Sequence, residues 1–304
     1  MTSKAPAILV VGADSLIGGA LMLELETAGW PVMGTSRRRE QADNVFQLDL
    51  ADDMARWESL EPIDVAIICA GITGLNKCVD DPEGSRMVNV DGVSALAENF
   101  ISKGSFVIYL STNQVFDGAA PYPSPGDPTS PITEYGRQKA EAERRIMALK
   151  DKAAILRMTK VLGEHNKLFE TWLTLLKKGE PITPFSDINF SPVPLGFVVS
   201  ALKRMVDVQM PGLFHLSGEK DVSYEYAARM GGEIVGADEG LILPATSQSL
   251  GAYTEPQPKN TALDIASFVS FYGGAPPPVD WTLRAAFTGA IALRHKIRSA
   301  TREQ

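Results

Sequence analysis

Cysteine and histidine are scarce in this chain, with two cysteines and three histidines among 304 residues. Two isolated thiols cannot build the disulfide framework of a small secreted protein, so they indicate a reducing compartment. Cys69 lies in the apolar run 65–70 and is expected to be a buried strand residue. The histidines lack the spacing of metal ligands and no cluster of Cys and His exists, so we predict no bound metal.

Long apolar runs and positive charge are also lacking. No segment approaches the roughly 20 residues that span a bilayer, and residues 1–6 lead into a short apolar strand without the apolar core of a signal peptide. We therefore expect a cytoplasmic protein. With 29 Lys and Arg against 37 Asp and Glu, the formal net charge is −8. Such a chain is poorly suited to nucleic acid or an anionic membrane, and an anionic ligand would need a local basic pocket.

Apolar strands and helical patterns alternate through the first half of the chain. Residues 7–11 form a continuous apolar run that ends at Gly12, which is typical of a parallel strand buried on both faces. Further strands are predicted at 31–35, 45–48, 64–70, 105–110 and 153–156, and helices at 16–28, 83–102 and 135–149. This alternation predicts an α/β fold with a Rossmann-type, doubly wound parallel sheet, whose ligands bind at the carboxyl ends of the strands.

The second half of the chain is less regular. The pattern predicts helices at 168–178, 195–208, 224–231 and 280–298, a strand at 212–217, and proline-rich loops at 118–131 and 180–194. We interpret these segments as a smaller, interleaved C-terminal α/β domain that shapes a substrate pocket. The predicted division is a dinucleotide-binding domain at 1–163, to which 190–217 returns, and a mainly substrate-binding domain at 164–304.

A turn with two glycines separates the first strand from the first helix, in the segment Gly12-Ala-Asp-Ser-Leu-Ile-Gly18. The first glycine permits a tight turn, Gly18 permits close approach of the helix, and the helix N-terminus meets a pyrophosphate with its free N–H groups. Ser15 replaces the middle glycine of the usual pattern. The residues predicted to bind a dinucleotide here are Gly12, Asp14, Ser15, Leu16, Ile17 and Gly18.

The ends of the second and third strands distinguish between the two nicotinamide cofactors. The second strand ends in Ser36, Arg37 and Arg38 and offers no acidic residue for a ribose hydroxyl. Arginine binds a 2′-phosphate through charge-assisted hydrogen bonds, so NADPH is predicted and NADH is the less favoured cofactor. The alternative is a solvated basic turn. After the third strand come Asp49, which either binds the adenine amine or caps a turn, and Leu50.

The segment Tyr135-Gly-Arg-Gln-Lys139 is the strongest local signal. At four-residue spacing the tyrosine and the lysine share one helix face. The ammonium is predicted to lower the phenol pKa, so that the pair exchanges a proton with a carbonyl oxygen while hydride moves at carbon. The preceding strand ends in Ser111 and Thr112, whose hydroxyls are expected to orient that carbonyl. The alternative is a surface tyrosine and lysine on an amphipathic helix.

Short motifs spread over most of the sequence point to one family, at 10–18, 69–71, 88–92, 110–118, 130–131, 135–139, 191–192, 212–218 and 258–264. Together they resemble the extended short-chain dehydrogenase/reductases, and among these the dTDP-4-dehydrorhamnose reductase family. The resemblance implies NADPH, a nucleotide-linked 4-keto-(deoxy)sugar as substrate, and proton donation by a tyrosine whose neighbouring lysine also binds ribose. It implies that the catalytic residues are Thr112, Tyr135 and Lys139. The residues implied at the cofactor are Cys69, Ala70, Gly71 and Asn89.

Two positions after the fifth strand depart from the family pattern. The family usually reads Ser-Thr-Asp-Tyr-Val-Phe, whereas this chain has Asn113 and Gln114 in place of the carboxylate and the phenol. The related dehydratases imply an acidic pair at this point, so the neutral pair counts against a 4,6-dehydratase. Arg157 either faces a substrate phosphate or caps the sheet, and residues 165–166 either touch the substrate or form a polar loop. The residues considered for substrate contact are Thr73, Asn113, Gln114, Arg157, His165 and Asn166.

Three functions remain open from the sequence. The first is NADPH-dependent reduction of a nucleotide-linked 4-keto-(deoxy)sugar. The second is a nucleotide-sugar epimerase with tightly bound NAD, against which the pair Arg37-Arg38 argues. The third, implied by the family resemblance, is a non-catalytic NADP-binding regulatory subunit like that of methionine adenosyltransferase. A homodimer is a candidate assembly.

Overall fold

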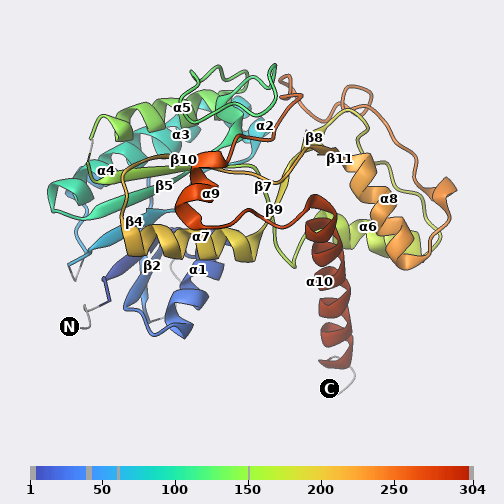
Figure 1. The fold of residues 1–304 in the computed structure, drawn as a ribbon, viewed down its shortest axis with the longest axis horizontal. Helices are drawn as coiled ribbons and strands as arrows, with labels where there is room; N and C mark the ends of the chain where they lie inside the picture. Colours follow the sequence, from blue (N-terminus) through green and yellow to red (C-terminus); the bar gives the residue numbers. More distant parts are fainter. Residues whose placement is uncertain (1–4, 39–42, 60–61, 150, 301–304) are drawn as a thin grey trace.

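The structure, a computed structural model, describes residues 5–38, 43–59, 62–149 and 151–300, with the backbone alone for 291–300. Within these residues a seven-stranded parallel sheet has the order β10-β6-β5-β4-β1-β2-β3 (Figure 1). Its strands are β1 (Ile8–Val11), β2 (Val32–Ser36), β3 (Val45–Gln47), β4 (Val65–Ile68), β5 (Phe106–Thr112), β6 (Ala153–Met158) and β10 (Gly212–Leu216). Strands β1, β4, β5 and β6 are buried throughout, as their continuous apolar runs predicted.

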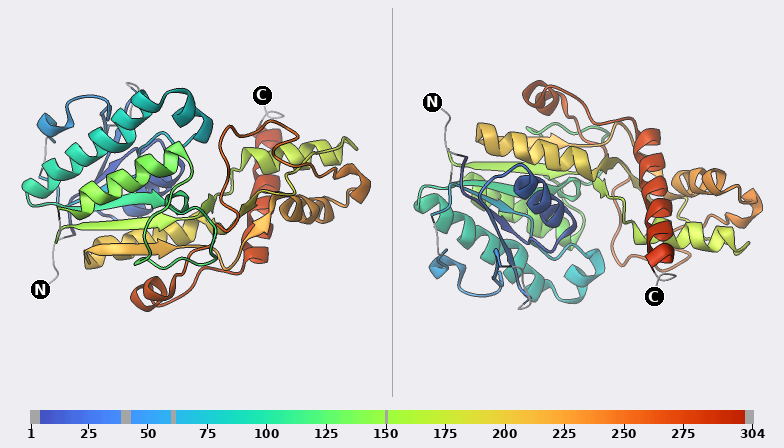
Figure 2. Two further views of the ribbon diagram at one scale, coloured as in Figure 1. Left: turned by 90° about the horizontal axis from the view of Figure 1, so that it is seen from above. Right: turned by 90° about the horizontal axis from the view of Figure 1, so that it is seen from below.

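Helices cover both faces of the sheet. One face packs against α1 (Leu16–Thr27), α7 (Leu195–Val208) and α9 (Ala266–Tyr272), and the other against α4 (Val93–Ser102) and α5 (Glu134–Met147). Figure 2 shows α4 and α5 on one side of the strands and α7 on the other. The predicted Rossmann-type, doubly wound fold is therefore confirmed. Because the strands are parallel, their carboxyl ends meet at one edge, where ligands of such sheets bind.

The helix predicted at 83–102 is interrupted by a wider turn. It consists of α3 (Pro82–Arg86), a π-helical segment at Met87–Gly92, and α4. The π segment carries Asn89, whose Oδ1 accepts a hydrogen bond from Ile72 N at 2.8 Å and whose Nδ2 donates to Ile72 O at 2.9 Å. Nδ2 also donates to Oε1 of Gln138 in α5 at 2.9 Å. The segment thereby fixes the loop after β4 against α5.

A smaller lobe lies beside the sheet (Figure 1). It is built from two short strand pairs, β7 (Lys160–Leu162) with β9 (Pro192–Pro194) and β8 (Asn189–Phe190) with β11 (Val222–Ser223), and three helices, α6 (Lys167–Lys177), α8 (Tyr224–Val235) and α10 (Val279–Ala300). The lobe has its own apolar core, in which the rings of Phe169 and Phe287 stack with centroids 4.3 Å apart. Among the described residues, no helix has both the length and the apolar character needed to cross a membrane.

Segments from the second half of the chain return to the sheet. Strand β10 extends it beside β6, and α7 packs on one face, so 190–217 contributes to the larger unit. Helix α9 also packs on the sheet, through Phe268, although the predicted division placed its residues in the substrate-binding domain. We therefore propose that the boundary between the two domains lies at 163–164, as predicted. We also propose that residues 266–272 belong to the dinucleotide-binding domain.

Candidate active site

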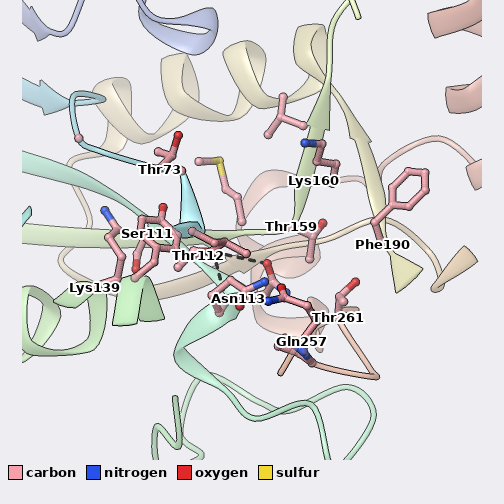
Figure 3. A pocket seen from close by; sticks show the side chains of 18 of the residues that line it. Thr73, Ser111, Thr112, Asn113, Lys139, Thr159, Lys160, Phe190, Gln257 and Thr261 are labelled. Carbon is pink, nitrogen blue, oxygen red and sulfur yellow. Dashed lines mark hydrogen bonds between the residues drawn. The ribbon is translucent and has the colours of Figure 1, made fainter. Parts of the chain in front are cut away.

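A cavity of about 680 Å³ lies between the carboxyl edge of the sheet and the smaller lobe (Figure 3). A second cavity of about 280 Å³ lies over the turn between β1 and α1. Residues of the loop after β4 line both cavities: Cys69, Ala70, Gly71 and Thr73. The two cavities therefore adjoin. The volume of the first is typical of small-molecule sites, and the volume of the second lies just below this range.

The structure brings the three predicted catalytic residues to one wall of the first cavity. Thr112 ends β5, Tyr135 lies in the first turn of α5, and Lys139 follows one turn later. The side chain of Thr112 lies next to the phenol of Tyr135, whose pKa it lowers. Figure 3 shows Lys139 beside Ser111 and Thr112. The four-residue spacing therefore places the phenol and the ammonium on one helix face, as predicted.

Local contacts determine where α5 begins. Oγ1 of Thr133 caps the helix by accepting a hydrogen bond from Gly136 N at 3.0 Å. Gly136 packs against the turn that follows β5, and a Cβ at this position would clash with the carbonyl oxygen of Gln114. The lack of a side chain at 136 therefore lets α5 approach the end of β5, and this keeps Tyr135 next to Thr112.

Lys139 is buried and is positioned by backbone and ring atoms. Its Nζ donates a hydrogen bond to Leu110 O at 2.6 Å and lies 3.9 Å from the ring centroid of Tyr109. Burial lowers the pKa of Lys139 to about 7, and the carboxylate of Glu143 opposes this shift without reversing it. Near neutral pH the amine is therefore divided between its charged and neutral forms.

Tyr135 is buried as well, and burial is the largest cause of a rise in its pKa. Cys78 also raises this pKa, the hydroxyl of Thr112 lowers it, and the net direction is upward. The predicted lowering by Lys139 is therefore wrong, because that amine is itself buried, points to the carbonyl of Leu110 and carries only part of its charge. A phenol that keeps its proton is suited to act as an acid.

Arg157 does not line either cavity, which favours the second of its two predicted roles, a contact within the sheet, over contact with a substrate phosphate. It lies in β6 and is buried, with its guanidinium bonded to both carboxylate oxygens of Glu143. The physical reason is that a buried guanidinium needs a carboxylate partner, and that partner holds it below the cavity. The hydroxyl of Ser111 donates to the same carboxylate, so this residue lines the cavity while its hydroxyl is already engaged.

The other residues considered for substrate contact divide into two groups. Thr73, Asn113 and Gln114 line the first cavity. His165 and Asn166 line neither cavity, which favours the alternative of a polar loop over contact with the substrate. Asn166 caps α6 by accepting hydrogen bonds from its first turn, and His165 is exposed with Nδ1 3.9 Å from a carboxylate of that helix. The start of a helix, rather than a ligand, uses these polar groups.

Close backbone packing shapes the turn between β1 and α1. Gly12 has a φ of +89°, and a Cβ there would lie 2.8 Å from Ala70 N. A Cβ on Gly18 would clash with the carbonyl oxygen of Gly12, so the turn requires both glycines. Ser15 takes the place of the middle glycine and caps α1, accepting a hydrogen bond from Gly18 N at 3.0 Å. The N-terminus of α1 is therefore open toward the second cavity.

Most of the predicted cofactor residues line one of the two cavities. The second cavity contains Gly12, Asp14, Ser15, Ser36, Arg37, Asp49, Leu50, Cys69, Ala70 and Gly71. The first contains Ile17, Asn89, Tyr135 and Lys139. Gly18 lies behind the turn, Leu16 is exposed, and Arg38 reaches to Asp14, with Nε 3.5 Å from its carboxylate. Of the two arginines, Arg37 is thus the one that faces a cavity.

One wall of the first cavity was not predicted from the sequence. The smaller lobe and the loops beside it supply Thr159, Lys160, Ile188, Asn189, Phe190, Tyr224, Tyr253, Gln257, Pro258 and Thr261. Among these, only 258 and 261 fall in a motif of the family resemblance. The others lie in loops, at a helix start or in very short strands, where hydrophobic periodicity carries no signal.

Within the described residues, no group of three or more His, Cys, Asp or Glu is placed to hold a metal ion. The thiols are also unreactive by their surroundings. Cys69 lines both cavities, and burial raises its pKa to about 12. Burial raises the pKa of Cys78 too. Because the thiolate is the nucleophilic form of cysteine, neither thiol is suited to act as a nucleophile here. The groups available for chemistry at this site are hydroxyl, phenol and ammonium groups.

Comparison with known proteins identifies the relatives of this chain. The family model of the RmlD substrate binding domain matches residues 6–289. The dTDP-4-dehydrorhamnose reductase of Mycolicibacterium smegmatis is 29% identical over 294 residues, 95% of this chain and 86% of that protein. The methionine adenosyltransferase 2 subunit beta of Xenopus tropicalis is 28% identical over 279 residues, 85% of this chain and 80% of that protein.

Solved structures show the same fold. The crystal structure of dTDP-4-dehydrorhamnose reductase from Bacillus anthracis in complex with NADP has a TM-score of 0.82 at 20% identity, covering 93% of this chain and 99% of that one. These findings confirm the predicted family resemblance and the fold. Because the relatives include dTDP-4-dehydrorhamnose reductases, they also confirm the predicted oxidoreductase class at the level of the family.

Proposed function

Because this chain belongs to the RmlD substrate binding domain family, we propose that it reduces a nucleotide-linked 4-keto-(deoxy)sugar with NADPH. The observation that carries the proposal is the common wall formed by Thr112, Tyr135 and Lys139 in a cavity that adjoins the glycine turn. The reductases among its relatives support the reaction class. The nucleotide-sugar substrate, the cofactor and the role of each residue are parts of this proposal.

The residues around the second cavity fit a dinucleotide. The N–H groups and the positive end of α1 face the turn that Gly12 and Gly18 shape, which suits a pyrophosphate. Arg37 supplies a cation for a 2′-phosphate, and the absence of an acidic residue at the end of β2 disfavours NADH. NADP in the Bacillus anthracis reductase supports the same choice. When bound, NADPH supplies the hydride.

Each catalytic residue has its own role in the proposed reaction. Thr112 donates a hydrogen bond to the substrate carbonyl oxygen and orients it. Tyr135 gives its proton to that oxygen, and its raised pKa keeps the proton available through neutral pH. Lys139 binds hydroxyls of the cofactor ribose from the wall that it shares with Tyr135.

The test is oxidation of NADPH by the purified protein, followed at the absorbance of reduced nicotinamide, with dTDP-, UDP- and GDP-linked 4-keto sugars. We expect steady turnover with at least one of these, and slower turnover with NADH at the same concentration. Binding of NADPH is checked separately by the rise in unfolding temperature that a native-state ligand causes. Protein that binds NADPH but reduces none of the keto sugars would contradict the proposal.

The methionine adenosyltransferase subunits among the relatives favour a second candidate, a non-catalytic NADP-binding regulatory subunit. The neutral Asn113 and Gln114 fit this candidate, since both replace groups of the reductase pattern inside the cavity. A stoichiometric protein partner, together with no turnover, would favour it. An epimerase would instead retain NAD and show no net cofactor turnover. A homodimer and a cytoplasmic location remain predictions.

A further inference from the structure

The first cavity is positively charged, although the chain as a whole is negative. Asp and Glu account for 37 of 304 residues, and the formal net charge is −8. None of the described residues that line this cavity is an aspartate or a glutamate, whereas Lys77, Lys139 and Lys160 all line it. An acidic protein repels an anionic ligand unless a local basic pocket opposes the overall field. The first cavity is such a pocket.

The three lysines of the cavity are not equivalent. Lys139 belongs to the catalytic wall, and its Nζ is already bonded to Leu110 O. Lys77 lies on the short helix α2 (Leu75–Asp80) and is exposed. Lys160 begins β7, and its side chain has no ion-pair or hydrogen-bond partner among the described residues. It is therefore free to pair with a ligand.

The surroundings of Lys160 favour pairing with an anion. Its side chain is open to the cavity, yet the walls around it still lower its pKa through burial. An ammonium held in a concave wall without a counter-charge is stabilised when an anion reaches it, because charge-assisted hydrogen bonds are stronger there than in open water. Asn113 and Gln114, which line the same cavity, are neutral, so neither competes for this ammonium as a carboxylate would.

Lys160 also lies close to the reacting groups. Strands β5 and β6 are in parallel register with Thr112 opposite Met158, and Lys160 follows Met158 by two residues. With neighbouring strands about 4.8 Å apart and about 3.3 Å per residue, its backbone is within roughly 10 Å of Thr112. Figure 3 shows Lys160 near Thr159 and Phe190, across the cavity from Lys139. A group that bridges Thr112 and Lys160 is therefore a part of the substrate near its carbonyl.

We propose that Lys160 is a specificity-determining residue that binds an anionic oxygen group of the nucleotide-sugar substrate. That group is either the diphosphate or a carboxylate on the sugar, and both present the same charged oxygens to the ammonium. The inference rests on the proposed function, because it takes a nucleotide sugar to occupy this cavity. It adds to that function by naming the residue that selects the charge of the ligand.

The experiment measures binding by isothermal titration calorimetry with NADPH present; none of the probes carries a keto group, so no hydride is transferred. The probes are UDP, dTDP, UDP-glucose and UDP-glucuronate. The sugar of UDP-glucuronate carries a carboxylate where that of UDP-glucose carries a hydroxymethyl group. Lys160→Met removes the charge and keeps the chain length, and Lys160→Arg keeps a cation. The matched control is Lys167→Met, the same change at an exposed lysine of α6 outside both cavities. Thermal unfolding confirms that each variant is folded.

We expect Lys160→Met to weaken binding about tenfold or more, Lys160→Arg to recover most of this loss, and Lys167→Met to change it less than twofold. Equal weakening for all probes identifies the diphosphate as the bound group. Weakening confined to UDP-glucuronate identifies a sugar carboxylate. In either case the loss should shrink at high salt, since screening weakens the wild-type contact.

Two results would overturn the inference: unchanged affinity of Lys160→Met for every probe, or a wild-type protein that binds none of them. The outcome is independent of turnover, because binding is measured without reduction of any sugar. A protein that binds the probes through Lys160 but oxidises no NADPH would refute the proposed reaction alone. A protein that reduces a keto sugar with unchanged kinetics in Lys160→Met would refute the role of Lys160 alone.

Discussion

Arg157 and Glu143 form a buried ion pair directly below the catalytic edge of the sheet. Nη2 of Arg157 lies 2.7 Å from Oε2 of Glu143, and its Nε lies 3.0 Å from Oε1. Ser111 donates its hydroxyl to the same carboxylate. Three elements, β5, α5 and β6, therefore meet at one buried charge, and this ties the helix of Tyr135 to the strand that carries Thr112.

Breaking this pair is expected to destabilise the fold. Glu143→Gln leaves the guanidinium buried without a counter-charge, which costs about 3–5 kcal/mol of unfolding free energy, and Arg157→Met has a similar effect on the carboxylate. The double variant should lose less than the sum of the two single losses, because the second change removes the uncompensated charge. Urea unfolding of the four proteins measures this. Strictly additive losses would show that the two side chains do not stabilise each other.

Tyr135→Phe removes the proposed proton donor and keeps the ring. We expect kcat for NADPH oxidation to fall by about 100-fold or more, since general acid catalysis contributes at least this much, while the affinity for NADPH stays nearly constant. Stopped-flow and steady-state kinetics measure the two quantities. The control is Tyr226→Phe, which removes a phenol on the exposed face of α8 outside both cavities. A rate for Tyr135→Phe within tenfold of the wild type would rule out its role.

Lys139 is expected to make the stability of the protein depend on pH in the alkaline range. Its pKa in the folded protein is about 7, below its ordinary value of 10.5. Between these values the unfolded chain binds more protons than the folded one, so the free energy of unfolding rises with pH from about 7 to 10. Below about pH 7, burial of the charged amine has its full destabilising effect.

The comparison with Lys139→Met isolates this contribution, because that variant lacks the titrating amine. Urea unfolding at several pH values should show the wild type gaining up to about 1.4 kcal/mol per pH unit relative to the variant between pH 7 and 10. Other titrating groups are common to both proteins and largely cancel. A difference that does not change with pH in this window would contradict the lowered pKa.

Arg37 and Arg38 are expected to differ in their effect on cofactor choice. Arg37 lines the second cavity, whereas Arg38 pairs with Asp14 on the surface and lines neither cavity. Arg37→Gln should raise the KM for NADPH about tenfold and leave the KM for NADH within threefold, because only NADPH carries the 2′-phosphate. Arg38→Gln should change both values less than threefold. The reverse order in a steady-state assay would assign the 2′-phosphate to Arg38.

The catalytic wall could be predicted from the sequence because it depends on local patterns. Continuous apolar runs mark parallel strands, whose carboxyl ends share one edge, and the four-residue spacing of Tyr135 and Lys139 sets one helix face. These rules are enough to bring both residues toward Thr112. The span of the helix at 83–102 was also correct, but its wide turn at Met87–Gly92 was not predicted, since apolar residues at helical spacing do not distinguish a π turn from an α turn.

The residues that could not be predicted depend on partners far away in the sequence. Arg157 is held below the cavity by Glu143, a residue of another element, and nothing near position 157 signals this. Asn166 has the sequence context of a polar loop, but its amide caps a helix that begins at the next residue. Lys160 lies in β7, which pairs with β9, and both strands are too short to produce a periodic pattern in the sequence.

Gly136→Ala tests whether the close approach of α5 to β5 positions the phenol. The added Cβ would clash with the carbonyl oxygen of Gln114, so the first turn of α5 must move away from the strand end. We expect kcat to fall at least about tenfold as Tyr135 separates from Thr112, together with a loss of about 1–3 kcal/mol in unfolding free energy from overpacking. Steady-state kinetics and urea unfolding measure the two effects.

The matched control for this substitution is Gly196→Ala in the first turn of α7, where no atom lies within 4 Å of the added Cβ. Because alanine has the higher helix propensity, this change should stabilise the protein by about 0.5–1 kcal/mol and leave kcat unchanged. Equal behaviour of the two variants would mean that α5 does not depend on the missing side chain at 136. A Gly136→Ala protein with lower stability but normal kcat would show that the contact supports folding without placing Tyr135.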